Sequence, residues 1–125
     1  MDPSSPPIPL ELCQRATRIF ELLGKRWSGV VVDLLLQRPA RFSELARAVP
    51  GLSERVLGER LRELEETGVV ERTVDPGPPI TVTYALTPLG AGFEPAMAEL
   101  RTWASKLMEH DVRVARPTGH ARRGA

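Results

Sequence analysis

The stretch RFSELARAVPGLSERVLGERLRELEETGVVER, residues 41–72, decides the fold. It contains two short helical patterns separated by the Pro-Gly pair at 50–51, and the second pattern is highly charged and includes a glycine. Two short helices joined by a turn of three or four residues that contains glycine are typical of a helix-turn-helix. The stretch therefore predicts this motif, and the sequence on either side of it is interpreted from there.

The second helical pattern has an apolar face and a charged face. The apolar face consists of Leu57, Leu61 and Leu64. Because these leucines are spaced four and three residues apart, they lie on one side of a helix. Ser53 is the predicted N-cap of this helix and Gly68 its predicted end. With the leucines turned inward, the opposite face presents Arg55, Glu59 and Arg62 to solvent.

The sequence before this helix predicts three more helices. The first covers about residues 11–23, and Gly24 is expected to end it in a left-handed cap. The second runs from Trp27 to the residue before Pro39, because proline cannot continue a helix. Ser43 is the expected N-cap of a short third helix. The residues expected to be buried are Ala16, Ile19, Phe20 and Leu23 in the first helix, Val30, Val31, Leu34 and Leu35 in the second, and Leu45, Ala46 and Val49 in the third.

After Gly68 the pattern changes from helical to alternating. Residues 69–74 and 80–86 are rich in β-branched side chains and flank the loop DPGPP, which predicts a β-hairpin. Thr87 is the expected cap of a last helix that has Pro88 at its first position. Apolar residues in this helix follow the a/d spacing of helices that pack against other helices. The expected dimer-interface residues are Phe93, Met97, Leu100, Trp103, Ala104 and Leu107.

This order of elements predicts a winged helix-turn-helix, mainly α with a small β-hairpin wing, in the α+β class. Residues 1–10, rich in proline, are expected to form a flexible arm, because their composition resists helix and strand. The domain is expected to cover residues 11–112, and the polar, basic residues 113–125 a disordered tail.

Length and composition favour one soluble globular domain. The chain has 125 residues, 42% of them hydrophobic and 26% charged, and no apolar run reaches the length of a membrane span. Its single cysteine excludes an internal disulfide and fits the cytoplasm. The sequence has no Cys/His metal spacing, Ser/His/Asp set or phosphate-binding glycine loop, so we expect neither an enzyme nor a metal or cofactor site.

The positive charge of the chain is concentrated around the helix-turn-helix. The net charge is only +1, but residues 38–62 hold six arginines against three glutamates. Since the major groove of B-DNA admits one α-helix and displays a distinct pattern for each base pair, the charged helix is a candidate for insertion there. The candidate DNA-contacting residues are Arg41, Ser53, Arg55, Gly58, Glu59, Arg60 and Arg62. The expected partner is double-stranded operator DNA.

Several of these residues have a second interpretation from the sequence. Arg55 can contact a guanine edge or a phosphate, or pair with Glu59 at i, i+4 on the helix surface. Glu59 can accept a hydrogen bond from a cytosine amino group or relieve crowding among arginines. Gly58, unfavourable in a helix interior, can allow close approach of DNA or relieve a clash within the protein. Arg41 and Arg47 can contact phosphates or belong to a solvated surface.

The chain resembles the HxlR-type winged helix-turn-helix regulators of bacteria, which are MarR-like. The resemblance covers roughly residues 13–107 and rests on segments that occur in the order and spacing of the family. These segments are GKRW, RFSEL, PGLSERVLGERLRELEETGVVER and YALTPLG. It implies a homodimer whose N- and C-terminal dimerisation helices pack together, so that two DNA-contacting helices are presented to a pseudo-palindromic operator. Arginines at positions 55, 60 and 62 match the DNA-contacting helix of the family. The wing tip DPGPPIT departs from the family in lacking a basic residue, which predicts weaker contact of the wing with DNA.

Control of this activity has two candidate forms. The resemblance places Cys13 where several family members carry a cysteine, which in some of them senses electrophiles or oxidants. The alternative is that Cys13 is a small buried hydrophobe, as a free cysteine usually is. The dimer region lined by Phe93, Met97 and Trp103 can hold an apolar small-molecule effector, or these residues can simply be core. A rival to the regulator hypothesis is a winged helix that binds protein without binding specific DNA, because a fold does not fix a function.

Overall fold

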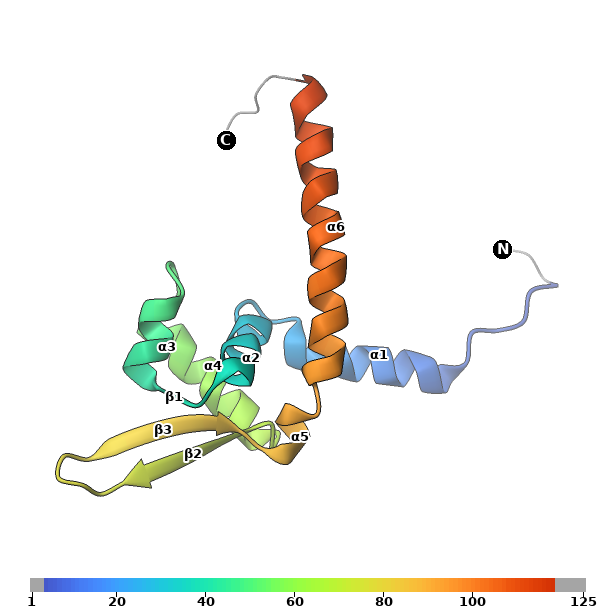
Figure 1. Ribbon diagram of the computed structural model, residues 1–125. Coiled ribbons are helices and arrows are strands. Elements are labelled where there is room, and N and C mark those ends of the chain that lie inside the picture. The colour runs from blue at the N-terminus through green and yellow to red at the C-terminus, as the bar shows by residue number, and fades with distance from the viewer. Residues whose placement is uncertain (1–3, 119–125) are drawn as a thin grey trace. The chain divides into compact units, whose positions relative to one another are not determined.

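The computed structural model describes residues 4–118. Its contacts divide the chain into two compact units, Met1–Ala91 and Gly92–Ala125. The helices and strands are α1 (Leu10–Leu23), α2 (Ser28–Gln37), β1 (Ala40–Arg41), α3 (Phe42–Ala48), α4 (Glu54–Glu66), β2 (Val70–Asp75), β3 (Thr81–Leu86), α5 (Pro88–Ala91) and α6 (Glu94–Thr118) (Figure 1). The first unit therefore contains the helix-turn-helix, formed by α3 and α4, and the hairpin β2–β3. The second unit is described by α6.

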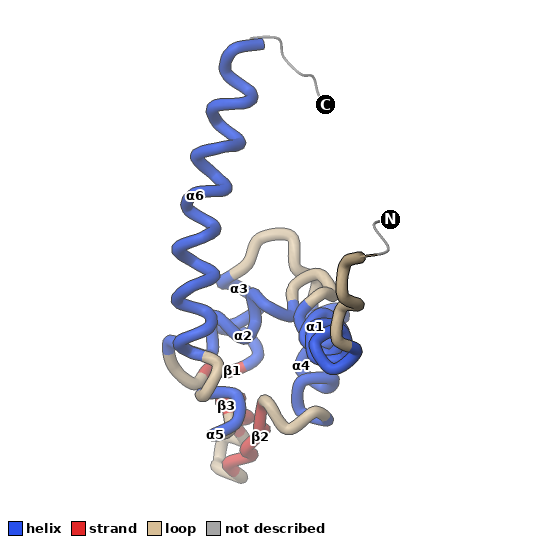
Figure 2. The backbone as a smooth tube through the Cα atoms, turned by 90° about the vertical axis from the view of Figure 1, so that its right-hand side faces the viewer, coloured by secondary structure: helices blue, strands red, loops and turns tan. Residues whose placement is uncertain are grey.

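The core of the first unit lies between α2, α3, α4 and the sheet. Leu57, Leu61 and Leu64 of α4 are at most 1% exposed, which confirms the predicted apolar face. Leu45 of α3 and Val70 of β2 are equally buried. Both views show α2, α3 and α4 on one side of the small sheet (Figures 1 and 2). Because non-directional apolar burial is the main driving force of folding, this leucine face fixes which side of α4 points outward.

Both ends of α4 are capped as the sequence predicts. The Ser53 hydroxyl accepts a hydrogen bond from the backbone N–H of Val56 at 3.1 Å. At the other end Gly68 has φ +83°, a left-handed conformation that favours glycine. The N–H groups of Gly68 and Val69 donate to the carbonyls of Glu65 and Leu64, both at 3.0 Å, and so close a Schellman motif. The helix boundaries are therefore encoded locally.

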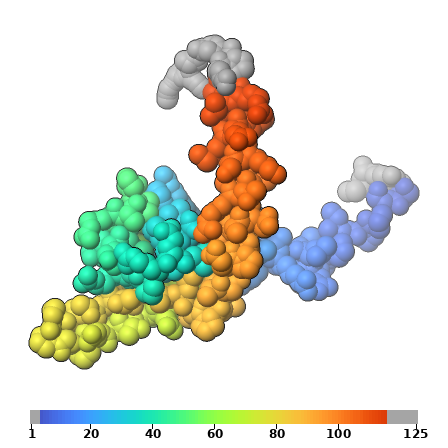
Figure 3. Space-filling view, viewed as in Figure 1, coloured from blue at the N-terminus to red at the C-terminus, as the bar shows by residue number. Residues whose placement is uncertain are grey.

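The wing is a three-stranded antiparallel sheet in the order β1-β3-β2. In the predicted hairpin, Val70 pairs with Leu86 and Asp75 with Thr81. The third strand, β1, has only two residues and pairs Ala40 with Tyr84, which the sequence did not indicate. The tip of the hairpin, drawn in yellow, extends beyond the neighbouring helices α2 and α3 (Figure 3).

The expectation for α1 is wrong in two respects. None of its residues is buried, and Ile19 and Phe20 are 50% and 70% exposed instead of lying in the core of this chain. Gly24 has φ −79°, so it does not form the left-handed cap that was expected. The left-handed residue of this loop is Trp27, with φ +83°.

The α2 and α3 helices occur where they were expected, with small differences in detail. Val31 and Leu35 are buried in α2, but Val30 is exposed and Val32 takes its place in the core. The α3 helix begins at Phe42, with Arg41 rather than Ser43 as its N-cap. The reason is that Arg41 also pairs in β1, so the chain leaves the sheet directly into the helix.

The last predicted helix is two helices. Thr87 caps α5 as expected, since its hydroxyl accepts from the backbone N–H of Gly90 at 3.2 Å, but α5 ends at Ala91. The second helix, α6, continues to Thr118, so residues 113–118 are helical and do not belong to a disordered tail. Residues 119–125 of that expected tail, and residues 1–3 of the expected arm, lie outside the described residues. Residues 4–9 contain neither helix nor strand. Within residues 4–118, no helix combines the length and the apolar character needed to cross a membrane.

Candidate nucleic-acid interface

The outward face of α4 presents two arginines on one side. Arg55 and Arg62 are both exposed, and they are seven residues apart, so they lie about 20° from each other around the helix. The Arg55 guanidinium is paired with the Glu59 carboxylate at 2.9 Å, and its side chain is 77% exposed. Among the residues that the structure describes, Arg62 has no ion pair or side-chain hydrogen bond. Both guanidinium groups are therefore exposed on one face of α4, where an external anion can reach them.

Gly58 lies on α4 at a position where a side chain would make few contacts. A Cβ atom built there has one neighbour within 4 Å, the ring atom Cε2 of Phe42 at 4.0 Å, which is ordinary van der Waals contact. The interpretation that Gly58 relieves a clash within the protein is therefore wrong for the described residues. The absence of a side chain leaves space at the surface of α4, next to Phe42 of α3.

Arg60 does not share the face of Arg55 and Arg62, and its selection as a candidate DNA contact needs correction. It lies about 140° around the helix from Arg55, and its side chain is only 17% exposed. Its Nε donates to the backbone carbonyl of Arg26 at 3.1 Å, and its Nη1 lies 3.3 Å from Glu63 Oε1. These contacts direct the guanidinium toward the α1–α2 loop.

The Glu44 carboxylate stabilises the start of α3. Glu44 accepts from the backbone N–H of Arg41 at 2.8 Å and pairs with the Arg38 guanidinium at 3.3 Å. These contacts lower the pKa of Glu44, with the Arg41 N–H as the largest cause and Arg38 as the next. Arg41 and Arg47 are exposed at the two ends of α3. Of the six arginines in residues 38–62, three are thus paired with acids of their own unit, namely Arg38, Arg55 and Arg60.

The other candidate DNA-contacting residues, Ser53 and Glu59, already form hydrogen bonds or ion pairs within the protein. The Ser53 hydroxyl is occupied as an acceptor by the N-cap bond, although the residue is exposed at the start of α4. Glu59 is 39% exposed and lies 3.9 Å from Arg60 as well as 2.9 Å from Arg55. It therefore relieves repulsion between two arginines, as one of its two interpretations proposed.

The wing adds little positive charge. Its tip residues are exposed, and Asp75 uses a carboxylate oxygen to accept from the backbone N–H of Gly77 at 3.1 Å. Arg72 of β2 is the one exposed base among residues 69–86. The tip itself, residues 75–81, contains no basic residue, and weaker contact of the wing with DNA stays a prediction.

The expected dimer-interface residues lie on α6. Leu100, Trp103 and Leu107 are 48%, 60% and 41% exposed, whereas Met97 is buried. Phe93 lies just before the helix and, like Ala104, is partly exposed. Large apolar side chains exposed at helical spacing are typical of a surface that another helix covers. This stripe and the apolar residues Leu12, Ile19 and Phe20 of α1 are exposed in the described chain.

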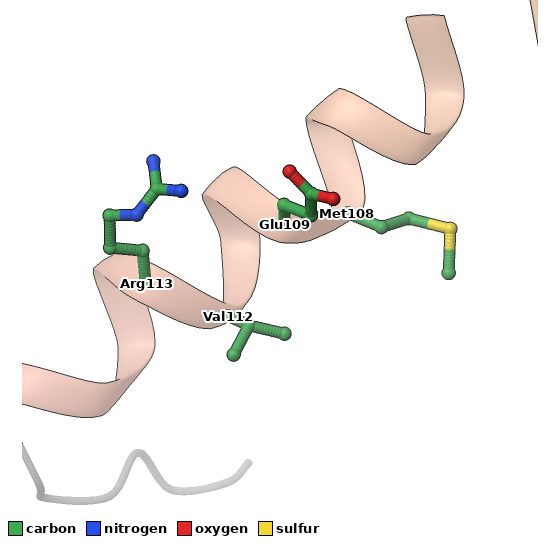
Figure 4. A pocket seen from close by; sticks show the side chains of 4 residues that line it. All are labelled: Met108, Glu109, Val112 and Arg113. Atoms are coloured by element: carbon green, nitrogen blue, oxygen red, sulfur yellow. The ribbon is translucent and has the colours of Figure 1, made fainter. Parts of the chain in front are cut away.

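The described part of α6 also carries a shallow hollow, lined by Met108, Glu109, Val112 and Arg113 (Figure 4). All four side chains belong to one helix and are exposed. The hollow is therefore an open surface, and it does not include Phe93, Met97 or Trp103, the residues expected around an effector. Among the described residues, no group of three or more His, Cys, Asp or Glu side chains is arranged to hold a metal ion.

Comparison with known proteins identifies the class of protein to which this site belongs. The chain matches the sequence profile of the HxlR-like helix-turn-helix proteins over residues 22–112. It is 39% identical over 98 residues to the HTH-type transcriptional regulator YodB of Bacillus subtilis, covering 78% of this chain and 88% of YodB. The chain belongs to the HxlR family. The predicted family and the winged helix-turn-helix class are therefore confirmed, and the chain is a helix-turn-helix transcriptional regulator.

Other HxlR-type relatives are similar over a comparable length. An uncharacterised regulator of B. subtilis, YvaP, is 42% identical over 99 residues, covering 79% of this chain and 92% of YvaP. The structure of reduced YodB matches with a TM-score of 0.68 and 39% identity, covering 74% of this chain and 90% of that one. YodB has also been solved in diamide-treated and quinone-bound forms. The redox regulator HypR in its oxidised form matches with a TM-score of 0.69 and 30% identity, covering 74% and 95% of the two chains.

The structure also resolves the position of the single cysteine of this HxlR-family chain. Cys13 lies on α1 and is exposed, so the interpretation that it is a small buried hydrophobe is wrong for the described chain. Arg15 is near in sequence but is paired with Glu11 at 2.6 Å. Cys13 is therefore accessible to small reagents in the described chain.

Sequence reasoning missed the contacts between α4 and the α1–α2 loop. Lys25 in the α1–α2 loop donates to Glu63 at 2.9 Å, and Arg26 supplies the carbonyl that Arg60 bonds. These partners are 38 and 34 residues apart, and neither pair follows a local spacing rule. The only available signal was the helical wheel, which places Arg60 at the side of α4, away from Arg55.

Proposed function

We propose that this regulator binds a pseudo-palindromic DNA operator as a homodimer. Each subunit places α4 in the major groove, where Arg55 and Arg62 contact base edges or phosphates. Ser53, Gly58, Glu59 and Arg41 line the same contact surface. The chain thus recognises a specific operator and is not a winged helix that binds only protein.

The observation that carries the proposal is the division of α4 into two faces. Its leucines are at most 1% exposed, whereas Arg55 and Arg62 are exposed on the opposite side. A helix held in this way can enter a groove of B-DNA with its cations foremost. Arginine is also the side chain best suited to bidentate contact with guanine.

The proposed homodimer is supported by the exposed apolar stripe of α6. Leu100, Trp103 and Leu107 expose a large area to water in the single chain, which a partner helix would remove. The two-fold symmetry of this dimer then provides two copies of α4. The two copies should lie about 34–36 Å apart, or a multiple of this, to reach successive turns of the major groove on one face of the duplex.

The test is selection of bound DNA from a random pool, followed by affinity measurements with variants. Arg55→Ala and Arg62→Ala should each weaken binding to the selected operator by about 1–3 kcal/mol if they contact bases. Equal losses on operator and scrambled DNA would assign the residue to phosphate. Arg18→Ala is the matched control, because Arg18 is an exposed arginine of α1 paired with Glu21. No enrichment of any sequence from the pool would favour the protein-binding alternative.

We further propose that oxidation of Cys13 controls operator binding. Cys13 is exposed and is the only cysteine, so it can react with a small thiol or with Cys13 of the partner subunit. The similarity to YodB, solved in reduced and diamide-treated forms, and to the redox regulator HypR supports this control. Diamide should change the operator affinity of the wild type and leave Cys13→Ser unchanged. An equal response of both proteins would remove Cys13 from regulation.

A further inference from the structure

A cluster of four residues joins the α1–α2 loop to α4. It consists of Lys25, Arg26, Arg60 and Glu63, and we call it the α4 clamp. Lys25 Nζ donates to Glu63 Oε2 at 2.9 Å, and Arg60 Nε donates to the Arg26 carbonyl at 3.1 Å. The two bonds join neighbouring loop residues, Lys25 and Arg26, to one flank of α4. They are tertiary contacts, since each spans more than thirty residues of sequence.

Glu63 connects the two bonds into one network. Its second carboxylate oxygen lies 3.3 Å from Arg60 Nη1, so the carboxylate bridges the cations of Lys25 and Arg60. The loop itself is shaped by Trp27 in a left-handed conformation, with the Arg26 guanidinium 4.6 Å from the centre of its ring. Arg60 is 17% exposed, in contrast to Arg55, which is 77% exposed. Arg60 is thus the partly desolvated member of the α4 clamp, whereas the side chains of Lys25 and Glu63 are 52% and 38% exposed.

The α4 clamp and the leucine face constrain α4 differently. The leucine face determines which side of α4 points outward, but apolar burial is non-directional and by itself sets no bond angle. Hydrogen bonds of guanidinium and ammonium groups weaken steeply when their angles change. The clamp residues lie on the flank of α4, about 80° and 140° around the helix from Arg55, so they can fix its rotation without entering the groove.

We propose that Lys25, Arg60 and Glu63 are positioning residues for DNA recognition, which set the rotation of α4 about its axis and thereby the direction of Arg55 and Arg62. The inference rests on the proposed function, because it requires an operator that α4 contacts. Arg60 acts through the loop carbonyl and makes no contact with DNA. Loss of the α4 clamp lowers the specific affinity while the fold and the dimer persist.

The experiment uses the full-length protein and the operator selected from the random pool. Lys25→Met and Glu63→Gln should each reduce operator affinity about tenfold relative to scrambled DNA, comparable with one mismatched base pair. Because both break one network, the double variant should lose no more than either single variant, whereas combination with Arg62→Ala should be additive. Lys25→Arg keeps a hydrogen-bond donor for Glu63 and should therefore retain most of the specificity of the wild type. Additive losses of Lys25→Met and Glu63→Gln, or wild-type specificity in both, would overturn the proposal.

Arg60→Lys separates positioning from phosphate contact. Lysine keeps the positive charge but cannot bond the Arg26 carbonyl and Glu63 in the same geometry. A positioning role predicts loss of specificity with an unchanged dependence of affinity on salt. A phosphate contact predicts that Arg60→Lys behaves as wild type and that Arg60→Met lowers the salt slope by about one, which would contradict the inference. Failure of the pool to yield any operator would instead refute the proposed function, and circular dichroism of each variant reports whether it folds.

Discussion

Gly58 has open space around the position where a side chain would begin. Its replacement by alanine meets only Phe42 Cε2 at 4.0 Å, so the native backbone accepts the new Cβ. Alanine is favoured over glycine in a helix, and we expect Gly58→Ala to raise the free energy of unfolding by roughly 0.5–1 kcal/mol. If DNA approaches the backbone here, the same variant should bind the operator more weakly.

Urea denaturation and operator titration measure the two effects of Gly58→Ala separately. Gly90→Ala is the contrasting variant, because a Cβ there would lie 2.3 Å from the backbone carbonyl oxygen of Val69 and should destabilise the fold. A Gly58→Ala protein that is more stable and binds DNA as well as the wild type would show that DNA does not come close to this position.

Single residues could be assigned from the sequence where their neighbours are local. Ser53 caps α4 through Val56, and Arg55 pairs with Glu59, and both contacts follow from helical spacing. Arg60 could not be assigned in this way, because its partner carbonyl is 34 residues away. The helical wheel shows that Arg60 does not share the face of Arg55 and Arg62, but only the fold shows which atom it bonds.

At the scale of elements, two carboxylates tie helices to their surroundings and make the stability depend on pH. Lys25 is the main cause of the lowered pKa of Glu63, and the Arg41 N–H is the main cause for Glu44. A carboxyl whose pKa is lower in the folded state contributes stability above its unfolded pKa, and this contribution is lost as pH falls through the folded value. We therefore expect the free energy of unfolding to fall below about pH 4.5, the ordinary pKa of glutamate.

Glu63→Gln tests this pH dependence. The variant should be less stable than the wild type at pH 7, and the difference should shrink as pH falls through the lowered pKa of Glu63 and the wild-type carboxylate becomes protonated. Glu65→Gln, an exposed position on the same helix, is the control. Denaturant titrations across this range make the comparison. A deficit of Glu63→Gln that does not change with pH would contradict the assigned ion pair.

The elements were predictable where a periodic pattern is long enough. The leucine spacing, Ser53 and Gly68 define α4, and the change to alternating residues defines the hairpin. Strand β1 has two residues, too few for any period, and exists only because Ala40 pairs with Tyr84. The expected burial of α1 was wrong because its apolar spacing indicates that a face is covered, not that the cover belongs to the same chain.

At the scale of the whole molecule, the proposed dimer depends on the exposed stripe of α6. Leu100→Glu places a charge in the middle of this stripe, and burying an unpaired charge at an interface is strongly unfavourable. We expect this variant to be monomeric and to lose tight operator binding. Lys106→Glu, an equally drastic change at an exposed position away from the stripe, should remain a dimer. Analytical ultracentrifugation distinguishes the two states, and a dimeric Leu100→Glu protein would place the interface elsewhere.

The central claim is that α4 of each subunit lies in the major groove, and cleavage of DNA from a tethered reagent tests it most directly. Glu54→Cys combined with Cys13→Ser leaves one cysteine, at the exposed start of α4, for attachment of an iron chelate. We predict two clusters of cuts in the operator, related by its symmetry and separated by about 10–10.5 base pairs or a multiple of this spacing. Retained operator binding with no localised cuts from this position would contradict the claim.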